Sequence, residues 1–169
     1  TFAKIITASL HPSEDPGIDP TAEFGEKGVM GFAAWPVTDL VTKRGIDIPR
    51  KALPLLKEVT KRFSAEFAVR PFLDAHTAET LEIFTSWTGD ANRHVRRLVS
   101  EGARPRLPWG MQLKKFVADP AQILPLLEVL RDDEEEYVRR SVANSLNDIA
   151  KDHPDLVAGI AENWLDGAD

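Results

Sequence analysis

Two stretches of the chain match each other at an offset of 43 residues, and this repeat limits the fold more than any other feature. The segment 77–99, TAETLEIFTSWTGDANRHVRRLV, aligns with 120–142, PAQILPLLEVLRDDEEEYVRRSV. In both segments an apolar helical pattern is followed by a turn that contains Asp, and then by Val-Arg-Arg on a second helical pattern. Helix-pair units of about 40–47 residues with this layout are typical of HEAT repeats, which stack side by side into a solenoid.

The rest of the chain also carries apolar residues at helical spacing, and no alternating strand pattern persists. Together with the repeat, this predicts an all-α HEAT-like helical-repeat solenoid, a right-handed superhelix of antiparallel helix pairs. Turns rich in Pro, Gly and Asp separate the expected helices, which cover 2–10, 22–43 with an interruption near Pro36, 50–63, 65–74, 77–88, 91–102, 120–131, 135–150 and 154–165.

We expect a single domain that covers residues 1–169, in which 77–119 and 120–153 are the clearest repeats. The segment 154–169 resembles a first helix whose second helix is missing, so it forms an incomplete last repeat. Because the sequence starts without Met inside an apolar pattern and stops after one helix, we expect a fragment of a solenoid that is cut at both ends.

The composition excludes several kinds of site. The chain has no cysteine, so disulfides and thiolate metal ligands are impossible. The four histidines lack metal-ligand spacing and no glycine-rich phosphate loop is present, so we expect no metal and no organic cofactor. No apolar run approaches the roughly 18 residues of a membrane span, and no signal peptide is visible. We therefore expect no membrane partner and a cytoplasmic, monomeric protein.

Positive charge gathers in the middle of the chain, although the net charge is −6. Residues 43–115 hold 15 Lys and Arg against 8 Asp and Glu, whereas 1–42 hold 2 against 6 and 116–169 hold 4 against 13. A local basic field can bind a polyanion whatever the total charge is. The alternative is that these cations only cover solvated helix faces.

The Val-Arg-Arg motifs place two arginines on each second helix. Arg96 and Arg139 occupy the position that forms a structural ladder between HEAT repeats, so we assign both to that role. Arg97 and Arg140 are predicted to be freer to face a ligand. Stacked along the second helices, they would form an extended cationic groove.

The connector 104–110, RPRLPWG, ends the preceding helix, because each proline removes a backbone donor and disfavours helix at the residue before it. It therefore carries two arginines and Trp109 on a stiff, non-helical segment. The 43-residue frame sets Arg104 opposite Asn147, so the connector is predicted to lie beside Asp148. The alternative is that Trp109 and the prolines only staple adjacent repeats together.

Two carboxylates stand among apolar residues. Glu66 lies in SAEFAVRPF, and Asp148 lies in SLNDIAKD, where Asp is a poor helix-interior residue. Each has an ordinary alternative. Glu66 and Arg70, four residues apart, would form a helix-surface pair, and Asp148 would be solvated or bonded to Asn144 or Lys151.

Three long motifs resemble one known family. The segments 64–73 (SAEFAVRPFL), 94–109 (HVRRLVSEGARPRLPW) and 137–156 (YVRRSVANSLNDIAKDHPDL) are similar to the AlkC branch of the DNA alkylation-repair glycosylases, relatives of the AlkD-type HEAT-like proteins. The resemblance implies an enzyme that removes 3-methyladenine and 3-methylcytosine from double-stranded DNA without fully flipping the base, unlike most glycosylases.

The same resemblance implies roles for individual residues. The family's acidic residue in AEF matches Glu66, its carboxylate in LND matches Asp148 and its aromatic in RLPW matches Trp109. Glu66 and Asp148 are thus the candidate catalytic residues, and Trp109 is the candidate substrate-binding residue. The candidate DNA-binding residues are the nearby cations and a histidine: Arg97, Arg104, Arg106, Arg140, Lys114, Lys115 and His94.

A different class of protein remains open. HEAT solenoids are often non-catalytic scaffolds, and a basic groove could bind DNA or an acidic protein partner without any chemistry. Measuring DNA binding and base release on the same sample separates the two hypotheses.

Overall fold

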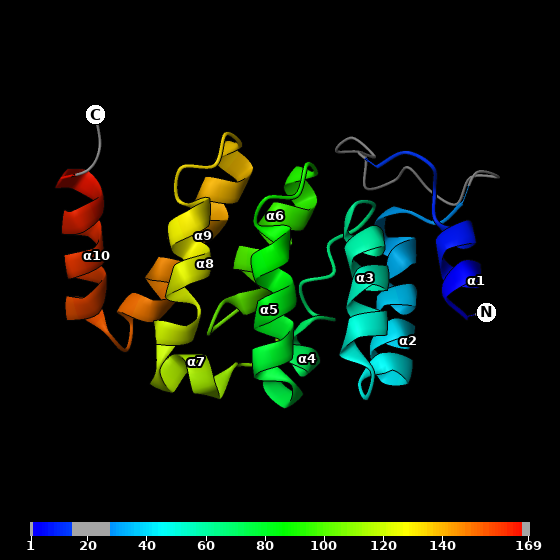
Figure 1. Ribbon diagram of the computed structural model, residues 1–169, viewed down its shortest axis with the longest axis horizontal. Helices are drawn as coiled ribbons and strands as arrows, with labels where there is room; N and C mark the ends of the chain where they lie inside the picture. The colour runs from blue at the N-terminus through cyan, green and yellow to red at the C-terminus, as the bar shows by residue number, and fades with distance from the viewer. Residues whose placement is uncertain (1, 15–27, 167–169) are drawn as a thin grey trace.

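The computed structural model describes residues 2–14 and 28–166 of the chain as a row of helices (Figure 1). Helix α1 stands at one end of the row and α10 at the other. The elements, with the two 3-10 helices labelled η, are α1 (Phe2–Ser9), η1 (Gly31–Ala34), α2 (Trp35–Gly45), α3 (Pro49–Thr60), α4 (Arg70–Ala75), α5 (Thr77–Trp87), α6 (Arg93–Ala103), α7 (Lys114–Ala118), η2 (Pro120–Gln122), α8 (Leu124–Leu130), α9 (Glu136–Ala150) and α10 (Pro154–Asp166).

The all-helical repeat architecture predicted from the sequence is confirmed in the described part of the chain. Apart from helices, these residues form an isolated β-bridge between Leu10 and Val29. Among them, no helix combines the length and the apolar character that crossing a membrane requires.

Helix α6 lies at the centre of the packing. It contacts α5 of its own pair, α3 on one side, and α8 and α9 on the other. Val95, Leu98 and Val99 are fully buried at helical spacing, but Glu101 and Gly102 on the same helix are buried as well. A Cβ on Gly102 would lie 2.6 Å from Val69 Cγ2, so the segment before α4 presses closely on α6. A helix enclosed on both sides needs partners for its polar side chains.

The predicted helix over 22–43 is only partly correct in the part that the structure describes, since residues 31–43 are helical and residues 28–30 are not. Residues 22–27 lie outside the described residues, Val29 takes part in the β-bridge, and α2 begins only at Trp35, after η1. Pro36 falls in the first turn of α2, where a helix has no use for the missing N–H group. The proline therefore starts this helix and does not interrupt it.

The predicted helix over 65–74 is shorter in the structure. Residues 66–69 form turns, and α4 begins at Arg70 because Pro71 is suited to a first helical turn. The loop between α3 and α4 therefore carries one of the two candidate catalytic carboxylates. The predicted helix over 120–131 is likewise divided into η2 and α8, and α7 was not predicted.

A ladder of ion pairs joins successive helix pairs. Arg96 Nε and Nη2 donate to the two carboxylate oxygens of Asp133 at 2.6 and 2.9 Å, across to the turn of the next repeat. Its Nη1 also donates to the carbonyls of Asp90 and Ala91 in its own turn. One repeat earlier, Lys57 Nζ lies 2.5 Å from Asp90 Oδ2. The structural role predicted for Arg96 is confirmed.

Arg139 reproduces half of this pattern one repeat later. Its Nη1 donates to the carbonyls of Asp133 and Glu134, the positions that follow Asp90 and Ala91 by 43 residues. The structure thus repeats the bond between the second helix and its own turn. This is the structural role that the sequence frame predicted for Arg139.

Replacing Asp133 with Asn is expected to lower the free energy of unfolding by about 1.5–3 kcal/mol, the contribution of hydrogen bonds to a charged group. Burial alone would raise the pKa of Asp133, but the hydrogen bonds and charge of Arg96 and the Glu135 amide hold that pKa below its ordinary value. The carboxylate therefore stabilises the fold above about pH 4 and loses this effect as the pH falls further.

Urea titrations of both proteins at several pH values measure this difference in stability. We expect the gap between them to narrow as the pH falls below about 4 and to close once the pH falls through the lowered pKa of Asp133. The control is Asp132→Asn, because Asp132 is 83% exposed and pairs with its sequence neighbour Arg131. An Asp133→Asn protein as stable as the control would contradict the ladder.

Candidate functional site

A groove of about 710 Å³ runs between α2 and the connector that follows α6. One wall comes from η1, the start of α2 and the α3–α4 loop, and the other comes from α6 and the connector. Charged side chains form its floor and aromatic rings stand on its rims. Its lining residues are Phe32, Trp35, Phe63, Ser64, Glu66, Phe67, Arg97, Glu101, Arg104, Leu107, Pro108, Trp109, Gly110 and Met111.

The connector presents Trp109 to the groove. Its side chain is fully exposed, and its backbone has φ of 59°, a left-handed conformation that is strained for a bulky residue. On either side of this tip the chain is fixed, because Leu107 is buried and the Leu113 amide donates to the Pro105 carbonyl at 3.1 Å. An exposed aromatic held in a strained conformation by anchored flanks is a candidate ligand contact, and it does not staple adjacent repeats.

A buried arginine fastens the connector to the helices below it. Arg70 is fully buried, and it donates from Nε to the Met111 carbonyl at 2.6 Å and from Nη1 to the Gly102 carbonyl at 2.9 Å. Burial, with the charge of Arg104 nearby, lowers the pKa of Arg70 to about 10, so Arg70 stays charged at neutral pH. Arg70 is buried and donates from Nε and Nη1 to these two carbonyls, while Nη2 is buried without a hydrogen-bond partner among the described residues, so Arg70 does not form the helix-surface pair with Glu66.

An aromatic cluster forms the wall across from the connector. Trp35 stacks on Phe67 with ring centroids 5.4 Å apart, and Phe63 contacts both Trp35 and Phe32 at 5.8 and 5.3 Å. Phe32 and Trp35 remain 62% and 45% exposed. Sequence reasoning missed this wall, because its rings come from two separate segments, 32–35 and 63–67, that meet only in the folded chain.

Glu66 lies on the α3–α4 loop and faces the groove. Its Oε2 accepts hydrogen bonds from Ser64 Oγ at 2.6 Å and from Arg97 Nη1 at 2.7 Å. Both bonds that it accepts from the described residues fall on this one oxygen, so Oε1 is left to accept a bond from a ligand or water. A carboxylate with one oxygen fixed and the other open is suited to act as a general base.

Asp148 lies on α9 and is only 2% exposed. Its Oδ2 accepts from Arg104 Nε at 2.9 Å, and its Oδ1 accepts from Lys151 Nζ at 3.1 Å. The prediction that the connector lies beside Asp148 is confirmed by the bond from Arg104. Asp148 does not line the groove itself, and Arg104, which does, stands between the two.

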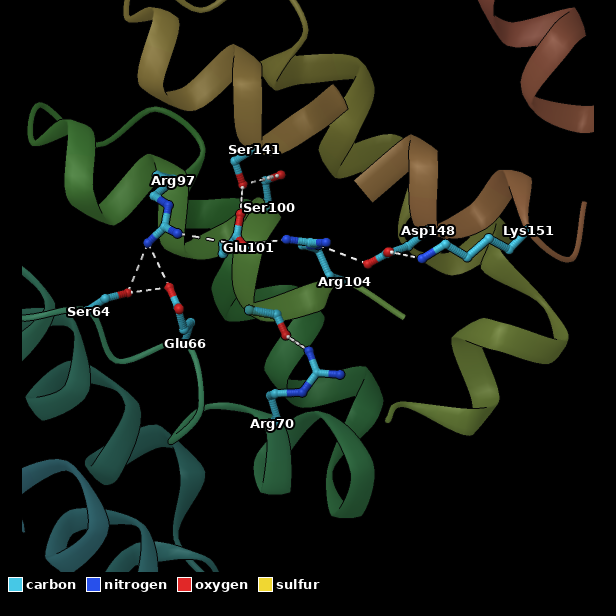
Figure 2. A network of polar contacts seen from close by, with 11 residues as sticks. Ser64, Glu66, Arg70, Arg97, Ser100, Glu101, Arg104, Ser141, Asp148 and Lys151 are labelled. Atoms are coloured by element: carbon cyan, nitrogen blue, oxygen red, sulfur yellow. Dashed lines mark hydrogen bonds and ion pairs between the residues drawn. The ribbon is translucent and has the colours of Figure 1, made fainter. Parts of the chain in front are cut away.

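Figure 2 shows the charged side chains of the groove floor as one connected network. Glu101 stands at its centre, where its Oε1 accepts from Arg104 Nη1 at 2.7 Å and lies 3.6 Å from Arg97 Nη2. Its Oε2 accepts from Ser141 Oγ at 2.7 Å. Arg97 lines the groove but already contacts two carboxylates, so a ligand that binds it must exchange with one of them.

Both groove arginines keep their charge despite being enclosed. Burial alone would lower the pKa of Arg97 and of Arg104. The charges of Glu66 and Glu101 act on Arg97, and hydrogen bonds to Asp148 and Glu101 act on Arg104, and they hold each pKa above the ordinary value for arginine. Along the groove floor, positively charged arginines therefore alternate with carboxylates, and each arginine is held by the carboxylates beside it.

The other predicted DNA-binding residues lie outside the groove lining. Arg106 makes a two-bond ion pair with Asp152 at 2.8 Å, and Arg140 pairs with Glu136 at 2.6 Å on the surface of α9. Five predicted DNA-binding residues are absent from the groove lining in the described part of the chain, namely Arg106, Arg140, Lys114, Lys115 and His94.

Three of these residues have other surroundings. Lys115 on α7 donates to the Asp74 carbonyl at 2.7 Å, and Lys114 beside it is exposed. His94 lies in a smaller pocket of about 130 Å³ that it shares with Arg97, and its ring makes a T-shaped contact with the ring of Tyr137. Within residues 2–14 and 28–166, no group of three or more His, Cys, Asp or Glu side chains is arranged to hold a metal ion.

The stacked helix pairs and this groove define a helical-repeat protein whose candidate site combines charged and aromatic side chains. Residues 37–162 match the family model described as DNA alkylation repair enzyme. The chain belongs to this family.

Two relatives place the chain more closely. It is 44% identical over 138 residues to the uncharacterized protein YhaZ of Bacillus subtilis, a match that covers 82% of this chain and 38% of that protein. It also superposes with a TM-score of 0.76, at 44% identity, on Pseudomonas fluorescens alkylpurine DNA glycosylase AlkC bound to DNA containing an abasic site analog, which covers 79% of this chain and 37% of the other. The chain thus spans less than two fifths of the length of either relative.

Proposed function

We propose that this chain forms the base-excising site of a DNA glycosylase that acts on cationic alkylated bases in duplex DNA. The bases are 3-methyladenine and 3-methylcytosine, removed without full base flipping and without a metal or an organic cofactor. One observation carries the proposal: Glu66, with one oxygen open, shares a groove with the exposed Trp109. The 44% identity to an alkylpurine DNA glycosylase supports it.

The chemistry follows from the charge of the substrate. A base alkylated at N3 is a cation, so it leaves with the electron pair of the N-glycosidic bond as a neutral base and needs no acid. The deoxyribose develops positive charge at C1′, which an adjacent carboxylate stabilises. Glu66 Oε1 takes a proton from water while the water oxygen bonds to C1′. The products are the free base, an abasic sugar and one proton.

Asp148 is proposed as the second carboxylate of the site. It lies behind Arg104, whose Nε donates to Oδ2 at 2.9 Å, and Lys151 donates to Oδ1 at 3.1 Å, so two cations offset its negative charge in the free protein. A DNA phosphate that enters the groove competes for Arg104 and leaves the negative charge of Asp148 to act on the sugar cation. Arg104 would in this way connect DNA binding to the second carboxylate.

The basic side chains predicted to bind DNA, together with His94, are proposed to contact phosphates in and around the groove. Arg97 and Arg104 lie at the floor, and the residues outside it are Arg106, Arg140, Lys114, Lys115 and His94. Most of them already pair with carboxylates in the free protein, so a phosphate must exchange with an existing partner, as at the 2.8 Å pair of Arg106 with Asp152. Binding that rests on such contacts weakens steeply as salt rises.

The decisive experiment measures two quantities on one sample of purified protein and methylated duplex DNA. Chromatography of the ethanol-soluble fraction quantifies released 3-methyladenine and 3-methylcytosine, and fluorescence anisotropy measures DNA binding across a salt series. We expect release of both bases and salt-sensitive binding. Binding without release would support a non-catalytic scaffold and would overturn the proposal.

Replacing Trp109 with Ala is expected to slow base release by about 5- to 30-fold, because a cation–π contact is worth about 1–2 kcal/mol when desolvated. Since the side chain is fully exposed, the melting temperature should stay within about 2 °C of the parent protein. Single-turnover release of 3-methyladenine is the measurement, and Trp164→Ala, on α10 away from the groove, is the control. Excision at the parental rate would remove Trp109 from the site.

A further inference from the structure

We propose that Glu101 is a positioning residue, which keeps one oxygen of Glu66 open by holding the arginine that binds the other. This rests on the proposed function of the groove. The sequence motifs did not single out Glu101, and it has no place in the chemical steps above. It is nevertheless the residue through which the two candidate catalytic carboxylates are connected (Figure 2).

The connection is a chain of alternating charges. Glu66 Oε2 lies 2.7 Å from Arg97 Nη1, and Arg97 Nη2 lies 3.6 Å from Glu101 Oε1. The same Oε1 lies 2.7 Å from Arg104 Nη1, and Arg104 Nε lies 2.9 Å from Asp148 Oδ2. Glu101 is therefore the one shared partner of the two groove arginines in this chain of contacts.

Burial makes this carboxylate hard to replace. The Glu101 side chain is 6% exposed, and a buried carboxylate persists in the charged form only when it is paired. Two guanidinium groups and the Ser141 hydroxyl satisfy it. Without its charge, Arg97 and Arg104 would face each other as two cations, each with a single carboxylate remaining, and buried Arg70 would add a third nearby.

The consequence for Glu66 follows from the shape of a guanidinium. Arg97 now divides its fork, with Nη1 on Glu66 and Nη2 toward Glu101. Arginine prefers to bind one carboxylate with two parallel bonds. If Glu101 loses its charge, Arg97 is free to turn its whole fork to Glu66 and to occupy Oε1. That oxygen is the one that must accept the proton of the attacking water.

The test variant is Glu101→Gln, which keeps the size of the side chain and removes its charge. We expect single-turnover release of 3-methyladenine to fall by about 10- to 100-fold, within the range for a displaced general base, while the Kd for DNA containing an abasic analogue changes less than twofold. Ser141→Ala is the matched control, because it also removes a hydrogen bond to Glu101 but leaves every charge in place. Its rate should stay within twofold of the parent.

A double-mutant cycle distinguishes positioning from simple damage to the fold. If Glu101 acts through Glu66, Glu101→Gln should slow the Glu66→Gln protein by less than twofold, because the base is already absent. A variant that only loosens the structure would reduce the rate by the same factor in both backgrounds. Equal factors would overturn the proposal.

A crystal structure of Glu101→Gln tests the same proposal without relying on activity. We expect both Glu66 oxygens within hydrogen-bond distance of Arg97. An Arg97 that keeps a single bond to Oε2 would overturn the inference about Glu101 and leave the proposed function standing. If the parent protein releases no base, the proposed function fails, while the turn of Arg97 is still observed or excluded in the crystal.

Discussion

Glu66→Gln is expected to slow base release by at least about 100-fold, since a general base contributes about 10²–10⁴ to the rate. Glutamine keeps the size of the side chain, and its amide oxygen can still accept from Ser64 and Arg97, so the groove retains its shape. What is lost is the group that takes the proton of water and the negative charge beside the developing sugar cation. The rate constant of 3-methyladenine release under single-turnover conditions is the measurement.

The control for Glu66→Gln is Ser64→Ala, which removes one of the two bonds to Oε2 and leaves the carboxylate in place. We expect that variant to lose less than about tenfold, because a single hydrogen bond contributes about 1 kcal/mol. DNA affinity should be similar in both variants. A Glu66→Gln protein that excises within twofold of the parent would exclude this carboxylate from the chemistry.

Asp148→Asn is expected to lower both stability and excision. The Asp148 side chain is 3% exposed and pairs with Arg104 inside the protein, and breaking a buried pair by removing one partner costs about 3–5 kcal/mol. That loss arises because Arg104, itself largely buried, keeps its charge with one carboxylate fewer. Urea unfolding followed by circular dichroism measures the change in stability.

The control for this variant is Asp152→Asn, which breaks the exposed pair of Arg106 one turn later on the surface. We expect this second variant to unfold at nearly the same urea concentration as the parent, because exposed pairs are screened by solvent. Excision by Asp148→Asn is compared well below its unfolding transition, so that only folded protein contributes. Stability equal to that of Asp152→Asn would contradict the buried pairing.

The repeat frame was the part of the fold that the sequence could predict. Contacts in a solenoid join neighbouring repeats, so residues that recur at a fixed offset keep the same neighbours. Arg96 therefore meets Asp133 as the alignment suggests, and Arg104 meets Asp148 at 2.9 Å. Both contacts follow from the repeat: the 43-residue frame places Asp133 in the turn of the repeat after Arg96, and it sets Arg104 opposite Asn147, the neighbour of Asp148.

Features that depend on where an individual helix begins or ends could not be predicted from the repeat. Apolar spacing predicted a helix through Glu66, but Pro71 is placed to start a helix at Arg70, and the carboxylate falls on a loop instead. The spacing of the charges on α6 did contain a signal for Glu101. Residues four before and three after it are Arg97 and Arg104, which places Arg97 on the same face of α6 as Glu101 and Arg104 directly after the end of that helix.

The candidate site is assembled from successive layers of the helix row, and this affects how it responds to heat. The α3–α4 loop supplies Glu66, the connector after α6 supplies Trp109, and α9 supplies Asp148. In a linear array the repeats can separate locally before the whole chain unfolds. A rise in temperature that opens any one interface between neighbouring helix pairs would separate the residues of the site while most helices persist. Activity would then be lost at a lower temperature than the helical signal, and the difference between the two temperatures would reflect the stability of the weakest interface between helix pairs.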